Sequence, residues 1–151
     1  MTMLTITAGE RVFRARLEEE KAPATCAAFL RLLPWEQRLI HVRWSGESCW
    51  VPLGDLDLGV GFEDATSYPA PGEILLYPGG VSETEILFPY GACCFASKAG
   101  QLAGNHFLTI VEGLDELRPL GVKTLWEGAQ AVRFELAVEE RPGGAAGVPS
   151  T

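Results

Sequence analysis

Apolar and polar residues alternate over many short stretches of this chain, and a period of two residues predicts β-strands. The stretch 38–52 alternates, turns at residues 45–47 and alternates back, so we expect a hairpin there. Its first strand should place two sets of side chains on opposite faces: Ile40, Val42 and Trp44 on one, and Leu39, His41 and Arg43 on the other.

The alternation recurs on both sides of this hairpin, where glycines and prolines separate the apolar stretches. The other strands that we expect span residues 4–6, 12–17, 73–77, 85–90, 92–97, 106–111 and 131–139. The last of them alternates most regularly, and its inward face is predicted to carry Val132, Phe134, Leu136 and Val138.

Two stretches have the composition or spacing of helices instead. In residues 23–33, Pro23 suits the first turn of a helix, good helix formers follow, and Pro34 should end it. In residues 114–120, leucines recur at every third position, and Pro119 and Gly121 are expected to keep this second helix short.

This order of elements predicts a mainly β fold, a closed β-barrel of about eight mostly antiparallel strands with two helices, at about 23–33 and 114–120. We expect one domain over residues 1–140. From residue 141 onward the chain has almost nothing apolar to bury, so residues 141–151 are expected to form a disordered tail.

Charge and hydropathy narrow the range of partners. The 151-residue chain has a net charge of −8 and no stripe of Lys or Arg, so we expect no nucleic-acid partner. No segment approaches the roughly 18 apolar residues of a membrane span, and the N-terminus lacks the pattern of a signal peptide. We therefore expect a cytoplasmic protein without membrane attachment, and assembly into a homo-oligomer is left open.

The four cysteines do not form a recognisable redox or zinc motif. Cys93 and Cys94 are adjacent in sequence, and neither histidine has the spacing of a zinc ligand from a cysteine pair. We expect buried thiols, with no disulfide, no metal and no cofactor.

Three segments resemble the cyclophilin family, in the order in which that family has them. Residues 22–29, Ala-Pro-Ala-Thr-Cys-Ala-Ala-Phe, resemble the A-P-x-T-x-x-N-F start of the first cyclophilin helix, with Ala28 in place of Asn. Residues 40–43 resemble the Phe-His-Arg strand, and residues 107–117 resemble the F-G-x-V-x-E-G-M-D segment that leads into the second helix. The chain is most similar to an uncharacterised bacterial group of cyclophilin-like barrels, and the resemblance implies that fold.

The same comparison argues against prolyl isomerase activity. The position after the histidine, where cyclophilins have their catalytic arginine, is Val42, and Arg43 is one residue further along. In a regular strand such an offset reverses the face unless a bulge intervenes. The family's G-S-Q-F-F-I motif is replaced by residues 92–96, and the family's active-site histidine would fall near Gly104, two residues before His106.

The candidate ligand-binding residues are Arg43, Trp50, Tyr90, His106 and Phe107. An arginine fork suits a carboxylate or a peptide carbonyl, aromatic rings can stack on a ligand, and a histidine can transfer protons. Structural roles compete with these: Arg43 can pair with Glu47, Trp50 can belong to the core, Tyr90 can pack at a strand edge, and His106 can be a hydrogen-bonded structural histidine.

Two hypotheses about function follow. In the first, the barrel binds a small carboxylate-bearing metabolite or a peptide and has no isomerase activity. In the second, the protein is an enzyme, either a divergent peptidyl-prolyl isomerase or one that uses Arg43 and His106. A pocket that holds both Arg43 and His106 would favour the enzyme.

Overall fold

The structure is a computed structural model, and it describes residues 1–138. The expected disordered tail at 141–151, and the last two residues of the expected domain, lie outside the described residues. The elements, in chain order, are β1 (Met3–Ala8), β2 (Arg11–Leu17), α1 (Pro23–Leu30), β3 (Trp35–His41), β4 (Gly46–Pro52), β5 (Ala65–Thr66), β6 (Glu73–Tyr77), β7 (Glu85–Cys93), β8 (Ala96–Ser97), β9 (Gly100–Gln101), β10 (Gly104–Glu112), a 3-10 turn (Leu114–Glu116), α2 (Leu117–Glu127) and β11 (Gln130–Leu136).

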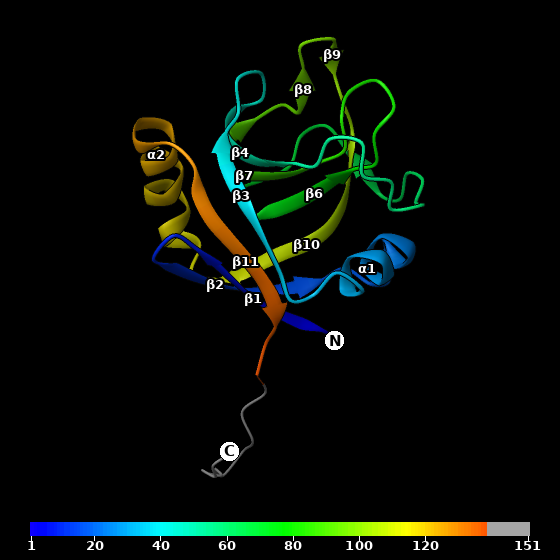
Figure 1. Cartoon of the computed structure of the whole chain (residues 1–151), viewed down its shortest axis with the longest axis horizontal. Helices are drawn as coiled ribbons and strands as arrows, with labels where there is room; N and C mark the ends of the chain where they lie inside the picture. Colours follow the sequence, from blue (N-terminus) through cyan, green and yellow to red (C-terminus); the bar gives the residue numbers. More distant parts are fainter. Residues whose placement is uncertain (139–151) are drawn as a thin grey trace.

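Eight strands close into an antiparallel barrel, as the sequence predicted (Figure 1). They follow the order β2-β1-β11-β3-β4-β7-β6-β10, and β10 pairs with β2 to complete the circle. The short strand β5 adds to β10, while β8 and β9 form a separate two-stranded ribbon. Closure gives each of the eight strands a partner on both sides, although β3 meets β4 only at the pairs Ile40–Trp50 and His41–Cys49.

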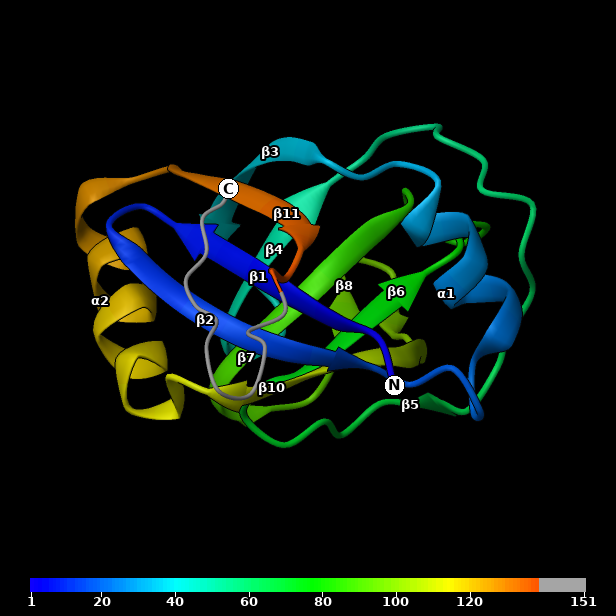
Figure 2. The ribbon, with the colours of Figure 1, turned by 90° about the horizontal axis from the view of Figure 1, so that it is seen from below.

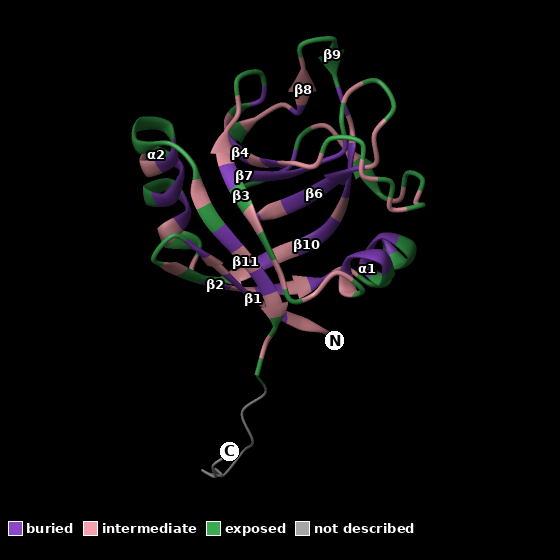
Figure 3. Cartoon of the chain, viewed as in Figure 1, coloured by how far each residue is buried: buried purple, intermediate pink, exposed green. Residues whose placement is uncertain are grey.

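The main core fills the inside of this barrel. Paired residues such as Ile6 and Phe13 point inward from β1 and β2, and both are fully buried. The intervening arginines, Arg14 and Arg16, lie on the wetter outer face, which is the expected alternation. In Figure 3 buried positions alternate with less buried ones along β2 and β11.

Strands β6 and β7 differ because they are buried on both faces. Their outer side packs into a second apolar cluster, formed by Leu75, Tyr77, Leu87, Phe95 and Leu102 with Val42, Trp50 and Cys93 against it. The turn between β3 and β4 and the β8–β9 ribbon project on this side of the barrel (Figure 1). The outer face of β6 and β7 is therefore covered by other parts of the chain, whereas the outer face of an ordinary barrel strand is exposed to solvent.

The two helices lie at opposite ends of the barrel, as Figure 2 shows. Helix α1 ends at Leu30, earlier than expected, and residues 32 and 33 continue as tight turns that bond back to Phe29 and Leu30. The helical conformation is unfavourable for the residue that precedes a proline, so the helix ends before Pro34.

Helix α2 is longer than predicted, running from Leu117 to Glu127 after the 3-10 turn. Pro119 lies in its first turn, where the missing N–H costs no hydrogen bond. Gly121 lies on the buried side of the helix and does not end it. The expected limits at these two residues were wrong.

The closing strand confirms Val132 and Phe134 as inward-facing core residues. Leu136 and Val138 are exposed, at 57% and 84% of their surface, so the predicted inward set was wrong at its end. Strand β11 ends at Leu136, beyond which alternation no longer places side chains in the barrel. Among residues 1–138, no helix is long and apolar enough to span a membrane.

Candidate functional site

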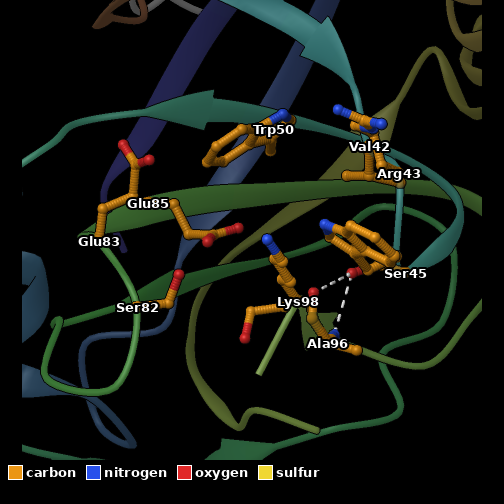
Figure 4. A pocket seen from close by; sticks show the side chains of 11 residues that line it. Val42, Arg43, Ser45, Trp50, Ser82, Glu83, Glu85, Ala96 and Lys98 are labelled. Atoms are coloured by element: carbon orange, nitrogen blue, oxygen red, sulfur yellow. Dashed lines mark hydrogen bonds between the residues drawn. The ribbon is translucent and has the colours of Figure 1, made fainter. Parts of the chain in front are cut away.

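A pocket lies on the covered outer face of the barrel wall, between the β3–β4 turn and the β8–β9 ribbon. Its cavity has a volume of about 170 Å³. An enclosed cavity of about 150 Å³ is enough to hold benzene, so this one suits a small molecule or the side chain of a larger one. It is lined by Val42, Arg43, Trp44, Ser45, Trp50, Ser82, Glu83, Glu85, Ala96, Ser97 and Lys98 (Figure 4).

Hydrogen bonds fix the edges of this pocket. The Ser45 hydroxyl donates to the Ala96 carbonyl at 3.0 Å and accepts from the Ala96 amide at 3.0 Å, which joins the β3–β4 turn to β8. On the opposite edge, the Tyr77 hydroxyl accepts from the amides of Val81 and Ser82 at 2.9 and 3.3 Å. The walls are thus held in place before any ligand arrives.

Arg43 lines the pocket together with Val42 and Trp44, so the expected alternation of these three residues was wrong. Strand β3 ends at His41, and the backbone bends through residues 43–45. The guanidinium carbon of Arg43 lies 5.7 Å from the centre of the Trp44 ring. Within residues 1–138 Arg43 makes no ion pair, and Glu47, its expected partner, pairs with Arg118 instead.

Trp50 forms an apolar wall of the pocket. Its neighbours in β4, Cys49 and Val51, point into the main core, and Trp50 points outward against the second cluster. The structure therefore brings Arg43 and Trp50, two of the five candidates, into the lining of one cavity.

Glu85 is a pocket residue that the sequence did not single out. It begins β7 and is only 6% exposed. Burial, with a smaller contribution from the neighbouring charge of Glu83, raises the pKa of the Glu85 carboxyl to about 8. Glu83 accepts a hydrogen bond from the Gly54 amide at 3.0 Å.

Tyr90 is not part of this pocket. It is 7% exposed, and its hydroxyl lies 2.8 Å from Nε2 of His41. Arg118 of α2 places its guanidinium carbon 5.4 Å from the centre of the Tyr90 ring and binds both carboxylate oxygens of Glu47, at 3.0 and 3.1 Å. These contacts attach α2 to β4 and β7.

His106 belongs to a separate chain of hydrogen bonds. Its Nε2 lies 2.7 Å from the Thr109 hydroxyl, which donates to Glu18 at 2.5 Å, and Glu18 also accepts two hydrogen bonds from Arg16. Burial raises the pKa of Glu18, but the bonds from Thr109 and Arg16 outweigh it and the pKa is lowered. Since the Thr109 hydroxyl donates its proton to Glu18, its oxygen is available to accept a hydrogen bond from an N–H at Nε2 of His106.

Phe107 is fully buried in the main core. Its ring centre lies 5.0 Å from that of Phe29 in an edge-on arrangement, which packs α1 against β10. The structure therefore does not bring Tyr90, His106 and Phe107 into the pocket that holds Arg43 and Trp50.

The remaining groups give no metal centre in the described part of the chain. No three His, Cys, Asp or Glu side chains come together there as metal ligands would. The four cysteines are free thiols, and burial raises the pKa of Cys26 to about 12 and of Cys49 to about 11.

Sequence reasoning missed Glu85, Lys98 and Trp44 as pocket residues. One signal was available for Glu85. It lies on the same face of β7 as Leu87, and the strand is otherwise apolar, so a carboxyl at this position indicates an unusual role. Lys98 lies in a short loop, and nothing in its local sequence indicates which residues it faces.

Comparison with known proteins places the chain in one family. A family model described as "Protein of unknown function (DUF3830)" matches residues 4–136. The comparison with curated proteins found no match.

Solved structures with the same fold include three proteins. McbB in complex with tryptophan matches with a TM-score of 0.66 and 20% identity over 96% of this chain, which spans 46%, about half, of the length of McbB. The hypothetical protein AF2241 from Archaeoglobus fulgidus has a TM-score of 0.56 and 18% identity, covering 90% of this chain and 95% of its own. A cyclophilin-type peptidyl-prolyl cis-trans isomerase from Cryptosporidium parvum has a TM-score of 0.55 and 13% identity, covering 91% and 98%. The expected cyclophilin-like barrel is thereby confirmed.

Proposed function

This chain belongs to the DUF3830 family of proteins of unknown function, and we propose that it binds a small carboxylate-bearing metabolite in the pocket beside Trp50, without prolyl isomerase activity. The observation that carries the proposal is the position of Arg43. Its cation lines a cavity of small-molecule size, next to an indole wall, and has no ion-pair partner within residues 1–138.

The chemistry of the pocket supports a carboxylate ligand. A guanidinium fork binds a carboxylate through two parallel hydrogen bonds, and Trp50 and Trp44 offer apolar surface to the rest of the molecule. The tryptophan bound to McbB is also a carboxylate-bearing compound, although the identity of 20% supports only the shared fold. For a ligand of this size, a dissociation constant in the micromolar to millimolar range is expected.

The enzyme alternative has less support. A pocket that holds both Arg43 and His106 would have favoured it, but His106 is hydrogen-bonded in the Thr109–Glu18 chain and does not line the pocket of Arg43. Arg43 is also one residue away from the arginine position of the cyclophilins, so the cation that isomerisation requires is displaced.

The test is a titration of the intrinsic tryptophan fluorescence, which Trp44 and Trp50 contribute from the pocket and Trp35 and Trp126 from outside it. The probes are 3-phenylpropionate and its uncharged amide, applied to the wild type, to Arg43→Gln and to Arg31→Gln, an exposed arginine outside the pocket. We expect the carboxylate to bind more tightly than the amide, with the difference lost only in Arg43→Gln. Equal binding of acid and amide, or an unchanged Arg43→Gln variant, would overturn the proposal.

A proline-peptide isomerisation assay tests the second part. Wild type and Arg43→Ala should both leave the uncatalysed rate unchanged. Substantial wild-type activity that disappears in Arg43→Ala would favour the divergent isomerase.

A further inference from the structure

The pocket carries charges of both signs: Arg43 and Lys98 are cations, and Glu83 and Glu85 carry carboxyl groups. Figure 4 shows Glu83 on the side opposite Arg43, with Trp50 between them and with Glu85 and Lys98 directed toward the intervening space. A ligand with only a negative charge would gain from Arg43 and Lys98 but would be repelled by Glu83, and by Glu85 as well once that carboxyl ionises. A ligand with only a positive charge would face the reverse problem.

Glu85 is the residue that lacks a partner. It is 94% buried, it is aimed into the pocket, and within residues 1–138 it makes no hydrogen bond or ion pair through its carboxyl. Glu47, Glu63 and Glu18, by contrast, are each bound by two or more donors. No fully buried side-chain oxygen or nitrogen of residues 1–138 lacks a hydrogen-bond partner, so the Glu85 carboxyl oxygens still face the space of the pocket. A largely buried carboxyl without a protein partner usually meets a ligand, a water or an ion in native proteins.

We propose that the ligand of this pocket is zwitterionic, an α-amino acid or a compound of that class, whose ammonium group binds Glu85 while its carboxylate binds Arg43. This inference rests on the proposed function and adds the second charge to it. The side chain of the amino acid lies against Trp50, and the volume of the whole pocket, about 170 Å³, favours a small side chain.

A metal ion is a poorer occupant of the same space. The described pocket offers only two carboxylates, one of them already accepting from the Gly54 amide, and places two cations beside them. An ammonium group needs fewer ligands than a metal ion, and the carboxylate of the same ligand neutralises Arg43, which leaves Lys98 as the one uncompensated cation among the residues lining the pocket.

The proposal predicts a characteristic dependence on pH. The ionisable groups that face Glu85 are Glu83 next to it, Tyr77 on β6, Lys98 on the β8–β9 turn and Arg43, while the adjoining part of β4 contributes none. Of these groups, Glu85 is the one whose burial places its pKa at about 8. An ammonium ligand should therefore bind more tightly as the pH rises from 6.5 to 8.5, whereas a simple carboxylate should bind less tightly.

The test begins with a thermal-shift screen of the standard amino acids, together with the deaminated acid and the decarboxylated amine of each. Calorimetry then compares the best amino acid with its two analogues at pH 6.5 and 8.5. We expect the amino acid to bind at least about tenfold more tightly than either analogue at pH 8.5.

Glu85→Gln should lower the affinity for the amino acid to that of the deaminated acid, and it should leave the deaminated acid bound as tightly or more tightly. Glu127→Gln, the same charge change on an exposed part of α2, should alter neither. Deaminated acids that bind as well as the amino acids, with no effect of Glu85→Gln, would overturn this inference and leave the proposed function standing. If only the amines bind, or no compound in the panel binds, the proposed function fails as well.

Discussion

Gly121 of α2 lies so close to Tyr90 of β7 that a Cβ atom at position 121 would come within 2.2 Å of the ring carbon Cδ2. Only hydrogen fits there, and the ring of Tyr90 is buried and cannot move away freely. This contact explains why a residue that disfavours helices lies in the middle of α2.

Gly121→Ala should therefore destabilise the protein, although alanine favours a helix by about 1 kcal/mol relative to glycine. Overpacking of this kind costs roughly 1–3 kcal/mol, and denaturation in guanidinium chloride measures it. Gly61→Ala is the matched control, because Gly61 has an ordinary φ and nothing within 4 Å of an added Cβ. Equal stability of both variants would contradict this packing of α2.

A second prediction concerns Asn105, which is fully buried at the start of β10. Its amide donates to the Thr25 hydroxyl at 3.0 Å and to the Gly61 carbonyl at 2.8 Å, and its side-chain oxygen accepts from the Glu63 amide at 2.9 Å. Asn105→Ala should cost about 2–4 kcal/mol, because it leaves these buried groups without partners. Gln101→Ala, on the exposed β9 strand, is the control for thermal or chemical denaturation and should change little.

The barrel could be predicted because most of its strands have one face in the core. Leu4, Ile6, Phe13 and Ala15 show this as a simple alternation that survives folding. Helix α2 could not be bounded in this way, since the role of Gly121 depends on Tyr90, which is distant in sequence. The low helix propensity of glycine predicted that α2 would end near Gly121, but the packing of Gly121 against Tyr90 places this residue inside the helix.

The pocket was predictable only in part. Arg43 and Trp50 were identified because an arginine and a tryptophan lie close together in one hairpin. The side of the barrel wall on which the Arg43 side chain lies was not predictable, because the regular alternation stops at His41, where β3 ends. Glu85 and Lys98 reach the pocket through the pairing of β4 with β7 and the position of the β8–β9 ribbon, and local sequence encodes neither.

The third prediction concerns Glu47, whose pKa is lowered to about 2 by the hydrogen bonds from Arg118 and from the Ala92 amide. A carboxyl with a lowered folded pKa stabilises the protein above its ordinary pKa and loses that contribution as the pH falls toward 2. NMR titration of the Glu47 carboxyl should show this low value in the wild type and a rise toward 4.5 in Arg118→Gln. An ordinary pKa in the wild type would mean that the ion pair is not formed in solution.

The last prediction is that Glu85 makes the protein less stable as the pH rises. Its pKa is about 8 in the folded chain and near 4.5 when exposed, mainly because burial disfavours the charged form. Between these two values the folded state holds a proton that the unfolded state has released, so the free energy of unfolding falls with increasing pH. Glu85→Gln keeps the shape without the charge. It should match the wild type near pH 4.5 and exceed its stability by about 1–3 kcal/mol at pH 8.5, since water in the pocket solvates part of the charge.

Thermal denaturation at a series of pH values measures the difference, with Glu127→Gln as the exposed control. Parallel curves for wild type and Glu85→Gln would mean that Glu85 ionises in the ordinary range, and the same variants would then show no effect of pH on amino-acid binding through this residue.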